Sequence, residues 1–255
     1  MLEDRYTSQA PDPQVTLDLF RGEWSSQVPV PGTCTGHADL FQDERIAWLI
    51  TQDYAHPDKT ALELGPLEAG HTCMLEHAGY RLAAVEANSR AYLKCLIVKE
   101  LLQLKSRFLF GDLNKHLKTT HKVGLIVASG VLYHQLDPIS TLGLIAAKAE
   151  RLFLWTHYYD PQLCTGKLFS HPETPKTEPF PHTLYPRSYE QALEWDGFCG
   201  GPATMSNWLS RRDLLRAIDH VGFEVKATAF DHPTHQNGPC LALYAIRKNT
   251  GAPAT

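Results

Sequence analysis

Three features are missing from this sequence, and each absence excludes a class of protein. No apolar run approaches the roughly 18 residues that a membrane-spanning helix needs. The acidic start MLEDRYTSQAPDPQ lacks the basic and apolar regions of a secretory signal, so we expect a cytoplasmic protein. Acidic residues outnumber basic ones by 28 to 24, and this balance disfavours a basic face for nucleic acid.

The cysteines are scattered, and none forms a CxxC pair. A zinc knuckle is therefore not expected, and buried free thiols are the simpler interpretation. The cysteines are Cys34, Cys73, Cys95, Cys164, Cys199 and Cys240.

Length and composition fit one sizeable globular domain. The chain has 255 residues, of which 43% are hydrophobic and 20% charged. Leu17, Leu19, Phe20 and Trp24 are large and apolar, so the first segment should pack on the body of the protein. We predict an N-terminal arm at 1–40, a main domain at 41–248 and a tail at 249–255.

An alternation of strands and helices runs through the main domain. It predicts βαβ units and a Rossmann-like, doubly wound α/β sheet of seven strands, mostly parallel, with an antiparallel C-terminal hairpin strand. Ser89 is the expected N-cap of the longest helix. The expected strands are 60–64, 80–85, 107–110, 124–128, 151–155, 224–230 and 241–247. The expected helices are 43–53, 70–77, 89–104, 138–149 and 210–221.

Between the fifth strand and the last helix lies a long, proline-rich segment, about 158–207. A loop of this length inside a compact domain is usually functional or disordered, and its aromatic residues argue against disorder. We expect an inserted cap over the carboxyl edge of the sheet, where open α/β sheets bind ligands. A structural loop that only fills the sheet edge is the alternative.

Four successive strand ends carry acids, glycines or small residues. The motifs are ELGPLEAG, VEAN, GDL and VASGVLYH. The first does not have GxGxxG spacing, which disfavours a dinucleotide. Glu86 stands about 20 residues past the first glycines, where an acid can accept both ribose hydroxyls. Asp112 could accept a hydrogen bond from an adenine amine, so the set suits an adenosine ligand without a pyrophosphate.

With these motifs in this order, the sequence resembles class I S-adenosylmethionine-dependent methyltransferases over about residues 40–248. VASGVLYH with a following Asp-Pro is similar to the group that contains wobble-uridine tRNA methyltransferases and many small-molecule methyltransferases. The resemblance implies S-adenosyl-L-methionine as cofactor. The cofactor-binding residues that it implies are Glu63 near the methionine end, Gly65, Pro66 and Gly70 in a loop that wraps the cofactor and that Pro66 stiffens, Glu86 with Ala87 at the ribose, Asp112 with Leu113 at the adenine, and Ser129 with Gly130 beside the sulfonium.

Each acid also has a purely structural interpretation. Glu63 could be a solvated acid at a strand end. Glu86 could cap the following helix, and Asp112 could cap the turn into Asn114 and Lys115.

Two histidines near the sheet edge are candidates for general base, His134 and His157. His134 could equally line the pocket without taking part in chemistry. The DHPTH cluster, with Asp231, His232 and His235, fits a solvated loop better than a metal site, so the sequence predicts no metal. The residues expected to contact the methyl acceptor are Tyr133, Trp155, Tyr158, Arg187, Trp195 and Phe198.

The predicted activity is O- or N-methylation of a small-molecule acceptor of metabolite or natural-product type. Two alternatives stay open. The first is a tRNA wobble-uridine modifying enzyme, which the acidic balance disfavours. The second is a non-catalytic cofactor-binding subunit that supports a partner. Neither the oligomeric state nor the acceptor can be read from the sequence.

Overall fold

A computed structural model describes residues 6–164, 167–169, 172–189, 200–201 and 203–248. Its centre is a seven-stranded sheet in the order β3-β2-β1-β4-β5-β10-β9. β3, β2, β1, β4 and β5 are parallel, and β10 pairs antiparallel with both of its neighbours. The predicted fold class is confirmed, including the C-terminal hairpin. The strands are β1 Thr60–Leu64, β2 Arg81–Glu86, β3 Arg107–Phe110, β4 Val123–Ser129, β5 Ala149–His157, β9 Phe223–His232 and β10 Cys240–Arg247.

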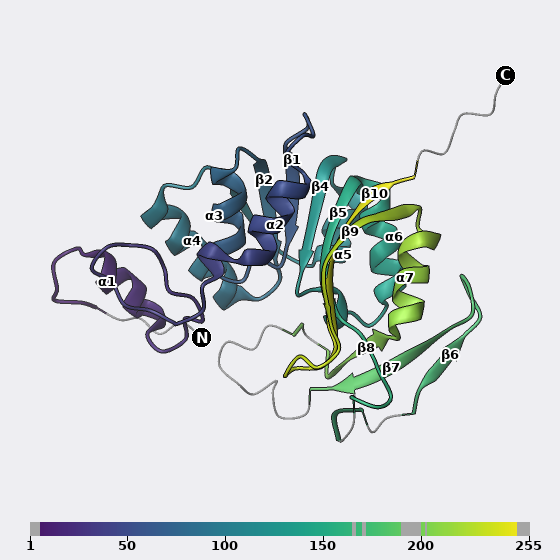
Figure 1. Cartoon of the computed structure of the whole chain (residues 1–255). Helices are drawn as coiled ribbons and strands as arrows, with labels where there is room; N and C mark the ends of the chain where they lie inside the picture. Colours follow the sequence, from purple (N-terminus) through teal and green to yellow (C-terminus); the bar gives the residue numbers. More distant parts are fainter. Residues whose placement is uncertain (1–5, 165–166, 170–171, 190–199, 202, 249–255) are drawn as a thin grey trace.

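Helices cover both faces of this sheet (Figure 1). Successive residues of a strand point to opposite faces of the sheet, so each strand contributes side chains to a hydrophobic core on each face. On β4, Ile126 packs with α5 Leu113–Thr119, α6 Pro138–Lys148 and α7 Arg211–His220. Its neighbours Leu125 and Val127 pack with α2 Glu44–Gln52 and α3 Gly70–His77 on the other face. Burial on both faces explains why β4 is an almost uninterrupted apolar run.

Two helix ends differ from expectation. The N-cap of α4 Ser89–Leu102 is Asn88, whose side chain accepts a hydrogen bond from the amide of Ala91, so the prediction of Ser89 was wrong by one residue. Asparagine and serine are both good caps, and sequence spacing does not separate them. α4 ends two residues early because Gln103 adopts a left-handed conformation, with φ of 54°. α5 was not predicted, because seven residues carry little periodicity.

The N-terminal arm packs against the body, as expected. It contains α1 Pro13–Leu17 and the short 3-10 helix η1 Asp18–Phe20, and a second 3-10 helix, η2 Leu40–Gln42, follows it. Leu17, Phe20 and Trp24 are buried in one cluster with α4. Leu19, in contrast, is 60% exposed, so its expected burial was wrong. Figure 1 shows the arm beyond α4, at the β3 side of the sheet. The division of the chain at residues 40 and 248 stays a prediction.

The inserted segment carries a small antiparallel sheet that the sequence did not predict. Its order is β6-β7-β8, formed by β6 Thr174–Lys176, β7 His182–Ser188 and β8 Met205–Leu209, and the short η4 Lys167–Phe169 precedes it. It lies past the carboxyl ends of β4 and β5 (Figure 1), where the indole of Trp208 donates a 3.1 Å hydrogen bond to the carbonyl of Tyr133. Tyr133 belongs to η3 Leu132–His134, which directly follows β4.

No helix within the described part of the chain is long and apolar enough to cross a membrane.

Candidate active site

A cavity of about 250 Å³ lies at the carboxyl ends of β1, β2 and β4. These strands are parallel neighbours, so their ends meet at one edge of the sheet. Most of the residues predicted to bind cofactor line this cavity. They are Gly65, Pro66, Gly70, Glu86, Ala87, Leu113, Ser129 and Gly130, joined by Tyr133, His134 and Trp155 from the predicted acceptor and catalytic residues.

The loop after β1 turns sharply at Gly65. Its φ is 67°, and its amide donates a 2.9 Å hydrogen bond to the carbonyl of Val85 at the end of β2. A side chain here would need a left-handed backbone and would meet Val131 at 3.0 Å. Gly70 is needed for a different reason. A Cβ there would lie 2.5 Å from the carbonyl oxygen of Leu40, so Gly70 admits the backbone that precedes α2.

Glu63 is almost fully buried behind the cavity and is not among its described lining residues. One carboxylate oxygen accepts a short hydrogen bond from the hydroxyl of Thr72. The other, Oε1, has no hydrogen-bond partner within the described residues and lies 3.8 Å from Nδ1 of His71. Burial raises the pKa of Glu63, while His71 and Thr72 oppose that rise. Its contact with a ligand would therefore run through His71 or a water molecule, and its place at the methionine end stays a prediction.

A second set of polar residues beside the cavity was not predicted from the sequence. Asp43 is the N-cap of α2. Its carboxylate accepts a 2.9 Å hydrogen bond from Nε2 of His71 and forms an ion pair with Arg45. Burial alone would raise the pKa of Asp43, but the bonds from Arg45 and His71 hold it well below its usual value. The guanidinium of Arg45 stacks 4.4 Å from the ring centre of Trp155.

These contacts place an imidazole between two carboxylates at one end of the cavity, with a guanidinium next to it. No local motif marks Asp43, Arg45 or His71 as site residues. The one sequence signal that could have pointed to them is their position near the predicted starts of two helices. The described lining residues absent from the prediction are Leu40, Arg45, Leu67, His71, Val85, Val131, Gln135 and Gly201.

Glu86 ends β2 with its carboxylate at the cavity wall. It accepts hydrogen bonds from the amides of Asn88, at 2.8 Å, and Leu67, at 3.3 Å. Burial raises the pKa of Glu86, and these amide bonds oppose the rise. The carboxylate thus holds the loops after β1 and β2 together, and its side chain is still 7% exposed toward the cavity. It therefore closes the turn that leads to α4 but does not cap that helix, whose N-cap is Asn88, and it can also accept a hydrogen bond from a ligand.

The third strand end behaves differently from the first two. The carboxylate of Asp112 accepts a 2.8 Å hydrogen bond from the amide of Lys115 as the N-cap of α5. Asp112 is not among the described lining residues, whereas its neighbour Leu113 is. The capping interpretation of Asp112 is therefore realised in the structure, and its contact with adenine stays a prediction.

The end of β4 supplies a hydroxyl and a tight turn. Oγ of Ser129 is buried without a hydrogen-bond partner among the described residues. Gly130 has a φ of 80°, and a Cβ there would lie 3.1 Å from the Trp155 ring. The following residue pair, Tyr133 and His134, places two rings 4.2 Å apart against the cavity.

His134 is paired with the inserted segment. Its Nδ1 lies 2.5 Å from the phenol oxygen of Tyr189, which is itself buried. Burial lowers the pKa of His134 to about 3, and the charges of Arg187 and His157 add to the effect. The imidazole is therefore neutral near pH 7. Nε2 keeps a free lone pair only when Nδ1–H donates to Tyr189.

His157, the other predicted base, is not among the described residues that line the cavity. Its Nδ1 donates a 2.9 Å hydrogen bond to the carbonyl of Gly238, and its ring stacks on Trp208 at 5.1 Å. Burial lowers its pKa to about 4. Possible ligand atoms of His157, His235 and Cys240 lie within 4.8 Å of one another. The bond to Gly238 occupies one nitrogen of His157, and burial raises the pKa of the Cys240 thiol. The absence of a metal stays a prediction.

Two further predicted acceptor residues, Tyr158 and Arg187, have partners outside the described cavity lining. The hydroxyl of Tyr158 donates a 2.8 Å hydrogen bond to Asp231. Arg187 lies over the rings of Tyr189 and Trp208, 5.5 Å from each centre. Neither Tyr158 nor Arg187 is a described lining residue. Trp195 and Phe198 lie outside the described residues.

No family model matches the sequence, and no curated protein matches it. Solved structures do resemble the fold. The N-terminal domain of EvdMO1, crystallised with S-adenosylhomocysteine (SAH) and D-fucose, has a TM-score of 0.63 at 18% identity and covers 92% of this chain and 94% of its own. Magnesium protoporphyrin IX methyltransferase from Synechocystis PCC 6803, with bound SAH, has a TM-score of 0.55 at 16% identity over 81% of each chain.

A third similar structure is 1,6-didemethyltoxoflavin-N1-methyltransferase from Burkholderia thailandensis, with a TM-score of 0.55 at 14% identity over 82% of this chain and 79% of that one. At these identities the likeness concerns the fold. The strand order, the hairpin and these structural neighbours together show that the chain has the fold of class I S-adenosylmethionine-dependent methyltransferases.

Proposed function

We propose that this protein is an enzyme that transfers a methyl group from S-adenosylmethionine to a small-molecule acceptor. The observation that carries the proposal is the cavity itself, in which Gly65, Glu86 and Ser129 from three neighbouring strand ends face one space. Three structural neighbours were crystallised with SAH, and two of them are named for small acceptors, a porphyrin and a toxoflavin precursor.

Polar groups in and behind the cavity wall fit this cofactor chemically. The buried Oε1 of Glu63 and Oγ of Ser129 have unused hydrogen-bonding capacity. Buried polar groups are rarely left unpaired, so a ligand with donor groups would satisfy them. In this assignment, Glu63 and His71 face the methionine end, Glu86 holds the ribose hydroxyls, and Leu113 with Asp112 borders the adenine.

When bound, S-adenosylmethionine supplies a methyl group on a sulfonium, whose leaving group is a neutral thioether. The chain then has mainly to align the acceptor and exclude water. Tyr133, His134 and Trp155 line the cavity where the inserted segment meets the sheet. Their packed rings favour a compact or planar acceptor at this end.

His134 is the candidate to receive the acceptor's proton. A base with a pKa of about 3 is weak, and it would not remove a proton from a resting alcohol. It can accept the acceptor's proton late in methyl transfer, because the O–H or N–H group of an acceptor that is gaining a methyl group becomes strongly acidic. As the acceptor gains the methyl group and the carbon–sulfur bond to the departing thioether breaks, Nε2 of His134 would take the proton that the acceptor loses.

Calorimetric titration with S-adenosylmethionine and SAH, with NAD as a control, tests the cofactor. We expect micromolar dissociation constants for the first two and no heat from NAD. Binding of NAD, or of none of the three, would contradict the proposal.

His134→Ala and Tyr189→Phe test the chemistry once an acceptor is found by screening with labelled methyl groups. Both variants should lower kcat by about 10-fold or more while KM for S-adenosylmethionine stays within about 2-fold. An unchanged kcat in His134→Ala would make this residue part of the pocket wall only.

A further inference from the structure

The N-terminal arm contacts the loop after β1 through residues that are not among those described as lining the cavity. The amides of Ser25 and Ser26 donate hydrogen bonds of 2.9 and 2.8 Å to the two carboxylate oxygens of Glu68. Nζ of Lys94, on α4, lies 2.6 Å from the same carboxylate and 2.9 Å from the carbonyl of Glu23. Glu68 and Lys94 are buried, so this contact is part of the interior.

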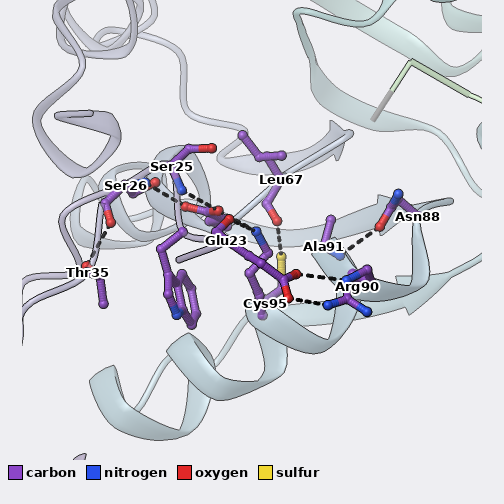
Figure 2. A network of polar contacts seen from close by, with 12 residues as sticks. Glu23, Ser25, Ser26, Thr35, Leu67, Asn88, Arg90, Ala91 and Cys95 are labelled. Carbon is purple, nitrogen blue, oxygen red and sulfur yellow. Dashed lines mark hydrogen bonds and ion pairs between the residues drawn. The ribbon is translucent and has the colours of Figure 1, made fainter. Parts of the chain in front are cut away.

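A second ion pair holds the same stretch of the arm. The carboxylate of Glu23 forms two hydrogen bonds with the guanidinium of Arg90, at the start of α4. Figure 2 shows Glu23, Ser25 and Ser26 gathered beside Leu67 of the loop. The arm is therefore fixed both to α4 and to the loop.

The loop needs such support because its backbone is unusual. Leu67 and Ala69, on either side of Glu68, have φ values of 54° and 64°, in the left-handed region that favours glycine. Residues in this conformation persist where surrounding contacts fix them. For Leu67 those contacts are its amide to Glu86 and its carbonyl to the thiol of Cys95, at 3.5 Å.

The supported loop is also a wall of the cavity. Gly65, Pro66 and Leu67 line it, whereas no residue of the arm between Tyr6 and Asp39 is among the described lining residues. The amide of Leu67 also bonds to Glu86, the residue assigned to the ribose. A change in the loop would therefore reach the proposed cofactor without any contact from residues 6–39 of the arm.

We infer that Glu68 is a positioning residue that couples the docked N-terminal arm to cofactor binding, an inference that rests on the proposed function. The arm's two amides and Lys94 hold the Glu68 carboxylate, and this fixes the left-handed loop in the form that binds the cofactor. Because coupling is reciprocal, bound cofactor also stabilises the arm.

Glu76 provides a matched control. Like Glu68, it accepts hydrogen bonds from two consecutive amides, those of Lys105 and Ser106, each at 2.8 Å. It sits on α3 and holds the segment before β3, away from the described cavity lining. Glu76→Gln should therefore disturb a similar anchor without touching the cofactor loop.

The experiment measures SAH affinity by calorimetry and amide hydrogen exchange by mass spectrometry in the full chain, for wild type, Glu68→Gln and Glu76→Gln. Glu68→Gln should weaken SAH binding by about 10-fold, within the usual range of coupling between sites. It should also speed exchange in residues 23–28 and 64–70. Glu76→Gln should speed exchange near 104–107 and leave SAH affinity unchanged. In the wild type, SAH should slow exchange in residues 23–28.

Equal SAH affinity in the wild type and Glu68→Gln would overturn the inference, as would an arm whose exchange SAH does not change. If the wild-type protein does not bind SAH, the proposed function is wrong. The positioning role of Glu68 is then tested by hydrogen exchange alone. Unchanged exchange in 64–70 would then overturn its positioning role. Should Glu68→Gln not fold, Glu23→Gln loosens only the pair with Arg90 and should show the same pattern more weakly.

Discussion

Two buried glutamates five positions apart flank the same loop, and they are held in different ways. Glu68 is met by two amides and a lysine, so both of its oxygens are used. Glu63 receives one hydroxyl, from Thr72, and its Oε1 has no hydrogen-bond partner among the described residues. Both side chains are essentially inaccessible to solvent.

The difference separates a structural carboxylate from one that is available to a ligand. A buried charge with a complete set of partners holds the protein together, and removing one partner is costly. A buried carboxylate with unused capacity costs stability in the free protein and recovers it when a donor arrives. Burial alone does not distinguish them, but their hydrogen-bond partners do.

The largest expected effect comes from removing the cation beside Glu68. Lys94→Met leaves that carboxylate buried without its ion-pair partner, which typically costs about 3–5 kcal/mol of unfolding free energy. Urea denaturation measures the loss. Lys226→Met, which breaks the exposed pair with Glu224, is the control and should change little. A loss below about 1 kcal/mol in Lys94→Met would show that the two amides alone suffice.

Glu63→Gln should have the opposite pattern, with a large effect on binding and a small one on stability. Glu63 reaches a ligand through His71 or a water molecule, and a hydrogen bond to a charged group in that chain contributes about 1.5–3 kcal/mol, so SAH affinity should fall by about 10-fold or more. The neutral amide removes the cost of a buried charge, so the melting temperature should stay or rise. A lower melting temperature with unchanged SAH affinity would place Glu63 with the structural carboxylates.

The pH dependence of stability sharpens the same contrast. Burial raises the pKa of Glu63 above 4.5, so the folded state retains a proton that the unfolded state releases. Its contribution is complete below about pH 4.5 and is lost as pH rises through the folded pKa. Relative to wild type, Glu63→Gln should therefore gain stability as pH rises from about 4.5, by at most about 1.4 kcal/mol per pH unit. Parallel stability curves for the two proteins would contradict the raised pKa.

Ser129→Ala should give the smallest effect. Its hydroxyl is buried and has no partner among the described residues, so the free protein should lose no stability. A neutral hydrogen bond to bound cofactor contributes about 0.5–1.5 kcal/mol, so SAH affinity should fall by about 2- to 10-fold. Calorimetry and thermal unfolding on the same sample check both. Lower stability without weaker binding would mean that the hydroxyl has a partner within the protein.

Much of the sheet was predictable because its signals are local. Apolar strands alternating with amphipathic helices specify a parallel sheet, and such a sheet brings the motifs at its strand ends to one edge. The small sheet β6-β7-β8 was missed because Pro175 and Pro186 interrupt its short strands. Proline within a run of this kind argues against a strand.

The site was predictable only where it follows strand ends. Gly65, Glu86 and Ser129 were predicted in this way, and the structure puts them around one cavity. Asp43, at the start of α2, contacts His71 of α3, 28 positions later, and no sequence spacing predicts that contact. His157 was a reasonable candidate at the end of β5, but its ring turns to the carbonyl of Gly238, 81 residues later.

The sequence by itself determined which segments form the strands and helices of the main sheet, the sharp turn at Gly65 and the acids at the ends of β1 and β2. It could do so because periodicity and turn chemistry act over a few residues. Only the tertiary structure decided what each buried acid does. Ser25 donates a hydrogen bond to Glu68 across 43 positions, whereas Oε1 of Glu63 has no hydrogen-bond partner in the described part of the chain and lies 3.8 Å from His71. A carboxylate's role depends on the donors around it, and the fold supplies those donors from distant parts of the chain.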